Sequence, residues 1–129
     1  MSANSSWNIA HFRSGLIRGL MDHGYRIVVA APEDEHSSLV RSLGVEFLPL
    51  PINSAGISIA EDAKLFLRYR QIVRTLKPFA FLGFTAKPNI YGSLAARLSG
   101  AKVINNITGL GTVFIKRSIL TAVVTGLYR

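Results

Sequence analysis

Helical and extended apolar patterns alternate along the whole chain of 129 residues. Apolar residues recur at helical spacing over 8–23, and the run 26–31 that follows is short and β-branched, as is typical of a buried parallel strand. The same pair of patterns repeats, with predicted helices over 34–43, 60–76, 89–99 and 113–128 and predicted strands over 45–50, 79–84 and 102–106. Strands joined through helices require crossover connections. The sequence therefore predicts a doubly wound, Rossmann-like α/β fold, with a parallel sheet covered by helices on both faces.

The start of the chain departs from this pattern. The first strand is central in the usual strand order, yet only residues 1–3 precede the polar loop 4–6. We therefore expect a largely truncated first strand that leaves a gap in the middle of the sheet, and a last helix that stops at Arg129 without a cap. A chain of this length buries one core, so we expect a single domain over 1–129.

Charge is distributed unevenly. The net charge is +8, and residues 60–129 hold eleven basic against two acidic residues, whereas residues 1–59 hold four against five. This asymmetry favours a phosphate-bearing partner, and composition alone leaves nucleic acid, lipid headgroups and a diphosphate substrate open. The chain has no cysteine, which excludes disulfides, thiolate metal sites and cysteine nucleophiles. No signal peptide or membrane-spanning run is recognisable, so a soluble or peripheral protein is expected.

Three polar or glycine-rich turns stand where a predicted strand hands over to a helix. In open α/β sheets ligands bind at that edge, and free N–H groups at a helix start favour anions or sugar hydroxyls. Ordinary helix capping by Ser6 or Asn8 and a solvated loop lysine are the competing interpretations. The residues concerned are Asn4, Ser5, Ser6 and Asn8 in the first turn, Thr85, Lys87 and Asn89 in the second, and Thr108, Gly109 and Gly111 in the third.

Several chemistries are disfavoured. The G-x-G-x-x-G and P-loop spacings are absent, which argues against nicotinamide or ATP binding by those routes. His11, His23 and His36 lack metal-ligand spacing. His11 is the one histidine near a predicted turn, and packing or hydrogen bonding explains it as well as catalysis does. No metal site is expected, and the catalytic residue is unknown.

Basic residues border the apolar stripe of the predicted helix 60–76. They are Lys64, Arg68, Arg70, Arg74 and, just past its end, Lys77. This pattern fits a helix lying on anionic lipid, but we favour the simpler interpretation, in which the stripe packs on the sheet and the cations reach into water. Helix 113–128 is the better candidate for a partner or membrane contact.

Three segments carry a family resemblance: NSSWNIAHFRSGLIRGLMDHGYRIVVAAPED at the start, the KP before strand 79–84, and TAKPNIYGSLAARLSGAKVINNITGLGTVF. They resemble the N-terminal domain of bacterial GT-B glycosyltransferases of family 4, above all the subgroup that extends lipid-diphosphate-linked sugars in surface polysaccharide synthesis. In that family the N-terminal domain binds the acceptor, and a second Rossmann-like domain holds the nucleotide sugar through an E-x7-E pattern. This chain has no place for that second domain.

The resemblance implies an acceptor-binding half of a retaining, metal-independent hexosyltransferase, inactive alone, that faces its substrates with the ten turn residues named above. It implies a UDP-linked sugar as donor substrate, no other cofactor, and a polyprenyl-diphosphate-linked sugar as acceptor. It also implies a cytoplasmic location at the inner membrane face, a possible contact with anionic lipid, no nucleic acid, and possible self-association through truncated edges. The alternatives are a GT-B-like sugar-nucleotide epimerase fragment and a non-enzymatic flavodoxin-like binding module.

Overall fold

The computed structural model describes residues 1–107, and it confirms the predicted α/β class. Strand β1 (Val28–Ala31) pairs in parallel with β2 (Glu46–Pro49), and β3 (Ala80–Gly83) pairs in parallel with β4 (Lys102–Asn105). The helices are α1 (Ser6–Phe12), α2 (Ser14–Asp22), α3 (Ser37–Ser42), α4 (Ile59–Leu76), the π-helix η1 (Pro88–Gly92) and α5 (Ser93–Leu98). The turn residues Thr108, Gly109 and Gly111 and the predicted helix 113–128 lie outside the described residues.

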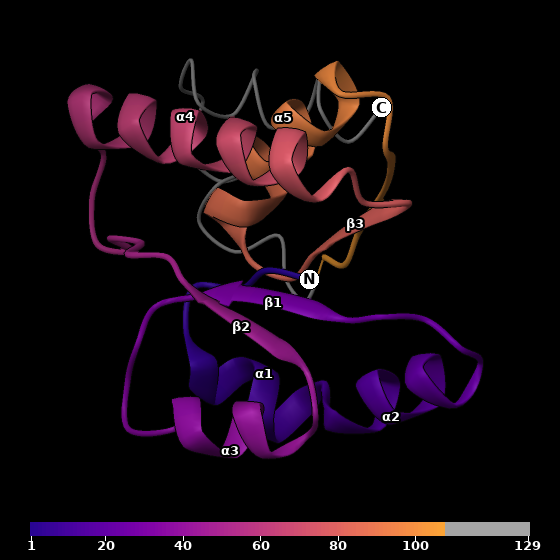
Figure 1. The fold of residues 1–129 in the computed structure, drawn as a ribbon. Helices are drawn as coiled ribbons and strands as arrows, with labels where there is room; N and C mark the ends of the chain where they lie inside the picture. Colours follow the sequence, from indigo (N-terminus) through magenta and orange to yellow (C-terminus); the bar gives the residue numbers. More distant parts are fainter. Residues whose placement is uncertain (108–129) are drawn as a thin grey trace.

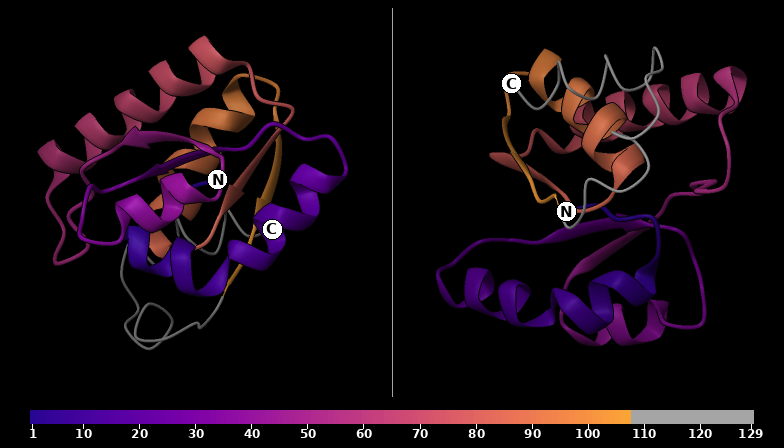
Figure 2. Two further views of the ribbon diagram at one scale, coloured as in Figure 1. Left: turned by 60° about the horizontal axis from the view of Figure 1, so that its bottom comes forward. Right: turned by 180° about the vertical axis from the view of Figure 1, so that it is seen from behind.

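Residues 1–3 join the two strand pairs into one sheet. Ser2 forms parallel bridges with Ala30 on one side and with Gly83 on the other. The resulting order is β2, β1, residues 1–3, β3, β4, so the start of the chain occupies the central position expected for the first strand. The N-terminus accordingly lies in the middle of the molecule, between the two strand pairs (Figure 2).

The sheet has helices on both faces, as the alternating pattern predicts (Figure 1). Helices α1, α2 and α3 cover one face over a core that includes Ile9, Ile17, Val29 and Val40. Helices α4 and α5 cover the other face over Leu65, Tyr69, Val73, Phe81 and Ala96. The buried stripe of α4 confirms that its apolar residues pack inward, while Lys64, Arg68 and Arg74 remain exposed.

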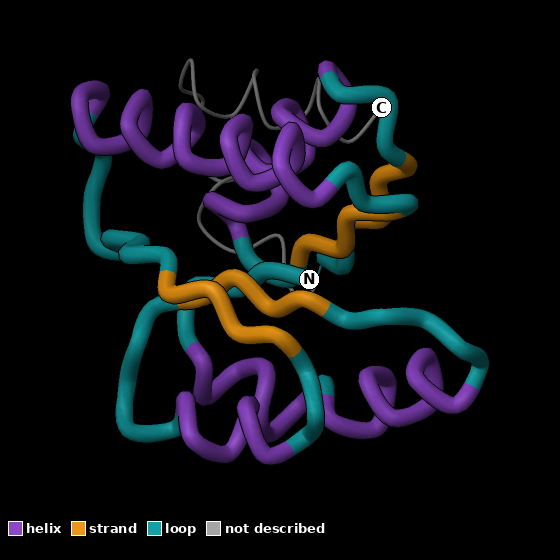
Figure 3. The backbone as a smooth tube through the Cα atoms, viewed as in Figure 1, coloured by secondary structure: helices purple, strands orange, loops and turns teal. Residues whose placement is uncertain are grey.

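Two predicted helices are not regular α-helices throughout, and the tube in Figure 3 shows the break in the first of them. The segment 8–23 is interrupted at Arg13, whose φ of −120° and ψ of −1° leave the helical region. The Arg13 guanidinium lies 4.4 Å from the centre of the Phe84 ring, a tertiary contact that periodicity does not reveal. The segment 89–99 begins one residue earlier than predicted, with the π-helical turn η1, and continues as α5.

Glycines end the helices that precede the first two strands. Gly24 and Gly44 have φ of +87° and +88°, a left-handed conformation that glycine adopts without steric cost. A glycine just past an apolar periodic segment is the usual sequence signal for a helix end, and both positions carry it.

Gly92 marks a close approach between η1 and the sheet. A Cβ added there would lie 2.2 Å from Cζ of Phe81, a buried ring that packs edge-on against Tyr69. Because this ring is enclosed, we expect Gly92→Ala to lower the free energy of unfolding by about 1–3 kcal/mol in urea denaturation. Gly19→Ala is the matched control. Gly19 lies inside α2 with no heavy atom within 4 Å of the added methyl, so a small gain of about 0.5 kcal/mol is expected. Equal losses in both variants would refute the packing explanation.

Candidate functional site

The loops that follow the parallel strands gather at the carboxyl edge of the sheet. The backbone N–H of Asn4 donates to Oγ1 of Thr85 (2.9 Å), which joins the first turn to the loop after β3. The amide nitrogen of Asn89 donates to the carbonyl of Asn106 (3.2 Å), which joins that loop to the end of β4. We call this edge, made of residues 4–8, 32–37, 84–91 and 105–107 together with Asp62, the polar rim.

The first turn of the rim is built on a capped helix. Oγ of Ser5, in extended conformation, accepts a bond from Asn8 N–H (3.2 Å) and so caps α1. Ser6 is fully buried: its N–H donates to Oδ2 of Asp34 (3.0 Å) and its hydroxyl donates to Pro32 C=O (2.7 Å). Capping was predicted for Ser6 or Asn8, but Ser5 performs it. Asn4, Ser5 and Asn8 are partly exposed, whereas Ser6 is buried and not accessible to a ligand.

Asp34 organises the loop after β1. Its Oδ1 accepts from His36 N–H (2.8 Å), and its own N–H donates to Oγ of Ser37 (2.8 Å). Ser37 in turn donates to Ser6 (3.2 Å), so one carboxylate connects the start of α1 with the start of α3. Asp34 was not predicted as a site residue. The signal that could have found it is an aspartate in the turn before a helix, because such a side chain commonly accepts the N–H two residues further on.

Aromatic rings cover the outer side of α1. Trp7 stacks on His11 at 5.0 Å between ring centres, and His11 meets His36 edge-on at 5.3 Å. Nδ1 of His11 contacts the Trp7 carbonyl (3.0 Å), so this histidine is engaged in packing and a local hydrogen bond. Oδ1 of Asn8 is buried and has no hydrogen-bond partner among residues 1–107.

Lys87 forms the charged centre of the rim. Its ammonium group contacts Oδ1 of Asp62 at 2.7 Å, and the hydroxyl of Tyr91 donates to Oδ2 of the same carboxylate at 3.0 Å. The side chains of Lys87 and Asp62 are 14% and 9% exposed. Burial, the hydrogen bond to Asp62 and its negative charge raise the pKa of Tyr91 to about 12. Tyr91 therefore remains a hydrogen-bond donor at neutral pH, and Asp62 is held between two donors.

Asp62 and Tyr91 were missed by the sequence analysis. Asp62 occupies the buried stripe of α4, in line with Leu65, Tyr69 and Val73. An acidic residue on an apolar helical face requires a partner, and that signal was present in the sequence. Its partner could not be named, because Lys87 is 25 residues away and reaches it only through the fold.

Asn89 holds the loop after β3 from within. It is 2% exposed, and a Cβ added at Gly83 would lie 2.3 Å from its Oδ1, so the glycine provides the space that Asn89 fills. Beside it, the hydroxyl of Ser93 donates to Oδ1 of Asn105 (2.6 Å). Of the predicted residues of this turn, Thr85 and Lys87 are partly exposed, whereas Asn89 belongs to the interior.

No group of three or more histidine or acidic side chains suited to a metal ion occurs within 1–107. In the same part of the chain, no helix combines the length and apolar character needed to cross a membrane.

The polar rim at the carboxyl edge of a Rossmann-like sheet agrees with the match of the chain to known proteins. The model of the glycosyl transferase 4-like family matches residues 3–126. The chain belongs to this family. The family match spans nearly the whole sequence, including every turn that forms the rim.

One curated protein and one solved structure illustrate the match. The chain is 26% identical over 129 residues to N,N'-diacetylbacillosaminyl-diphospho-undecaprenol alpha-1,3-N-acetylgalactosaminyltransferase of Campylobacter jejuni, covering 95% of this chain and 34% of the relative. The structure superposes on MurG of Acinetobacter baumannii with a TM-score of 0.62 at 20% identity, covering 81% of this chain and 32% of MurG. The second match supports the GT-B Rossmann-like fold. The chain spans about a third of the length of each relative.

Proposed function

We propose that the chain provides the acceptor-binding part of a retaining glycosyltransferase. Joined to a nucleotide-sugar-binding domain, it receives a polyprenyl-diphosphate-linked sugar and presents a hydroxyl group of that sugar to the donor. In the reaction the bond between the donor sugar and its nucleoside diphosphate breaks, and the diphosphate leaves with the bonding electrons. A glycosidic bond forms to the acceptor oxygen, and the proton of that hydroxyl passes to the leaving diphosphate or to water. A hexose or N-acetylhexosamine is the transferred group, and the site residues are Asn4, Ser5, Thr85 and Lys87.

The observation that carries this proposal is the position of Lys87. Its ammonium group lies at the carboxyl edge of the sheet, where parallel α/β folds bind ligands. Asp62 accepts a hydrogen bond from one of the three N–H groups of the Lys87 ammonium, and Lys87 is partly exposed, so a phosphate oxygen could accept from another. The polar groups of Asn4 and Ser5, from the neighbouring turn, suit the hydroxyls of the attached sugar.

A second support comes from the relatives. The Campylobacter jejuni protein is named for a diphospho-undecaprenol-linked substrate, which has the diphosphate that a rim lysine would contact. The exposed cations Lys64, Arg68 and Arg74 of α4 further suit a position beside the anionic headgroups in which such a lipid is embedded. We therefore propose that the protein works at the inner face of the cytoplasmic membrane.

The test uses the protein expressed from the complete gene that contains these 129 residues. It is incubated with radiolabelled UDP-hexose or UDP-N-acetylhexosamine, with and without an undecaprenyl-diphosphate-linked sugar in anionic vesicles. Label is expected to enter the lipid extract only when the acceptor is present, with the anomeric configuration of the donor retained in the product. Conversion of the UDP-sugar into its epimer in the absence of acceptor would instead establish an epimerase.

A further inference from the structure

The charge of the polar rim differs from that of the chain as a whole. The chain has a net charge of +8. Among the described residues that define the rim, Lys87 is the one lysine or arginine, and it is accompanied by the acidic residues Glu33, Asp34, Glu35 and Asp62. Both carboxylate oxygens of Glu33 bind Arg41, each at 2.7 Å. The rim is therefore not a basic pocket, and an anion that contacts Lys87 also meets a carboxylate.

Asp62 is fixed beside the Lys87 ammonium. Its backbone N–H donates to Ser58 C=O (2.8 Å) in the first turn of α4, and its side chain is buried. Oδ1 of Asp62 accepts from the ammonium at 2.7 Å, and Oδ2 accepts from the Tyr91 hydroxyl at 3.0 Å. Because both carboxylate oxygens and the backbone are engaged, Asp62 remains beside Lys87 when a ligand approaches.

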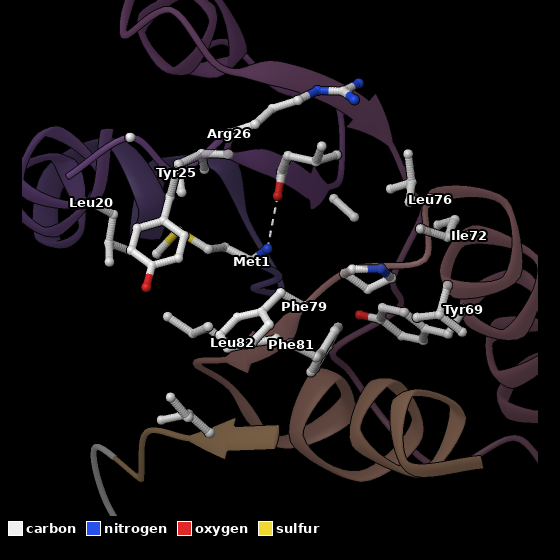
Figure 4. Close-up of a pocket in the computed structure, with 18 residues that line it drawn as sticks. Met1, Leu20, Tyr25, Arg26, Tyr69, Ile72, Leu76, Phe79, Phe81 and Leu82 are labelled. Carbon is white, nitrogen blue, oxygen red and sulfur yellow. Dashed lines mark hydrogen bonds between the residues drawn. The ribbon is translucent and has the colours of Figure 1, made fainter. Parts of the chain in front are cut away.

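The apolar cavity of the molecule is not suited to a diphosphate. This cavity of about 490 Å³ lies between the amino-terminal halves of β1 and β3, away from the rim, and Leu20, Tyr69 and Ile72 are among its lining residues (Figure 4). The guanidinium of Arg26, which also lines it, is paired with Glu46. A diphosphate would lose its hydration there, at a large cost in free energy. Recognition of ligand charge therefore falls to the rim.

The Lys87–Asp62 pair separates hydrogen bonding from charge attraction. The N–H groups of an ammonium are tetrahedrally arranged, so a phosphate oxygen bound to a second one lies roughly 4.5 Å from Oδ1 of Asp62. The hydrogen bond to the phosphate is retained. A further negative charge on the ligand, however, is attracted by the ammonium and repelled by the carboxylate, so its net attraction is less than about half of that to an unpaired ammonium.

We propose that Asp62 is a specificity-determining residue, which suppresses the binding of terminal diphosphates at the rim. A terminal diphosphate carries about three negative charges near pH 8, and a diphosphate esterified at both ends carries about two. This inference rests on the proposed function, in which the acceptor diphosphate joins a lipid to a sugar and is esterified at both ends. The nucleoside diphosphate released by transfer is a terminal diphosphate. Asp62 therefore keeps this product from occupying the acceptor site.

The test uses the protein expressed from the complete gene and two soluble ligands. Farnesyl diphosphate is the terminal diphosphate, and its methyl ester on the outer phosphate is the matched ligand with one charge fewer. Their dissociation constants are measured by titration calorimetry at pH 8 for the unsubstituted protein, Asp62→Asn, Lys87→Met/Asp62→Asn and Glu61→Gln. Glu61 is the matched control because it lies in the same turn of α4, is exposed and contacts Asn53 (3.1 Å) rather than Lys87.

The unsubstituted protein is expected to bind the two ligands within about threefold of each other, and Asp62→Asn to bind farnesyl diphosphate about tenfold more tightly than the methyl ester. Glu61→Gln should resemble the unsubstituted protein, and the double variant should lose the preference together with Lys87. A tenfold preference for farnesyl diphosphate in the unsubstituted protein would overturn the inference without recourse to any variant. So would a ratio that Asp62→Asn leaves unchanged, or one that Glu61→Gln raises equally.

These outcomes are separate from a failure of the proposed function. If neither ligand binds, or if both bind the double variant as tightly as the unsubstituted protein, Lys87 does not contact the diphosphate, and both the proposed function and this inference are overturned. Binding that depends on Lys87 with a ratio unaffected by Asp62 overturns this inference alone.

Discussion

Replacing Lys87 with Met is expected to lower the free energy of unfolding by about 3 kcal/mol. The substitution removes the ammonium group that lies 2.7 Å from Asp62. It leaves a carboxylate that is 9% exposed and that, among residues 1–107, keeps a side-chain hydrogen bond from the Tyr91 hydroxyl. A buried charge without its counterion keeps the cost of desolvation and loses the compensating attraction. Urea denaturation at pH 7 measures the loss.

The double variant Lys87→Met/Asp62→Asn provides the control. An amide in place of the carboxylate removes the buried charge and can still accept the Tyr91 hydroxyl, so the stability should return to within about 1 kcal/mol of the unsubstituted chain. The two substitutions are therefore expected to be strongly non-additive. Losses that simply add would mean that Asp62 and Lys87 do not stabilise each other.

Stability should rise steeply with pH in a chain whose amino group is that of Met1. Burial lowers the pKa of this group from 8.0 to about 5. Between these values the unfolded state binds the proton more readily than the folded state does, so the contribution to stability is complete above pH 8 and is lost as pH falls toward 5. Three pH units correspond to about 4 kcal/mol at most. Urea denaturation from pH 5 to 8, on material whose intact mass confirms Met1, measures the slope.

N-terminal acetylation isolates this contribution. The acetylated chain retains every other titrating group, including the three histidines, but its amide nitrogen has no charge to lose. The stability of the free chain relative to the acetylated chain should therefore increase as pH rises from 5 to 8. A difference that is constant over this range would show that the amino group is solvated in the folded protein.

Periodicity and turn chemistry predict most of the fold. The alternation of apolar helical and β-branched segments predicts every described strand, and glycine at positions 24 and 44 marks two helix ends correctly. The features of the fold that the sequence did not predict depend on tertiary contacts. The helix breaks at Arg13, whose guanidinium contacts Phe84 about seventy positions later, and η1 lies against Phe81 where Gly92 leaves room for its ring. The local pattern of apolar and polar residues predicts neither contact.

The rim was predictable in location but not in organisation. Parallel strands bring their carboxyl ends to one edge, so the polar turns were expected to meet, and the bond from Asn4 to Thr85 joins two of them. Tertiary contacts determine which polar residues remain accessible. Ser6 and Asn89 are buried and form hydrogen bonds within the protein, while Asp62, at the start of α4, positions Lys87.

The most direct test of the account is the Michaelis constant for the lipid-diphosphate acceptor in the complete protein, measured for the unsubstituted enzyme, Asp62→Asn and Lys87→Met/Asp62→Asn. Both variants lack the Asp62 charge, so the difference between their Michaelis constants for the acceptor measures the contribution of Lys87 alone. We predict that the double variant raises the acceptor constant about tenfold or more relative to Asp62→Asn, as expected for a lost hydrogen bond to a charged group, with the donor constant unchanged. Equal acceptor constants in the two variants would contradict a role for the rim in binding the acceptor diphosphate.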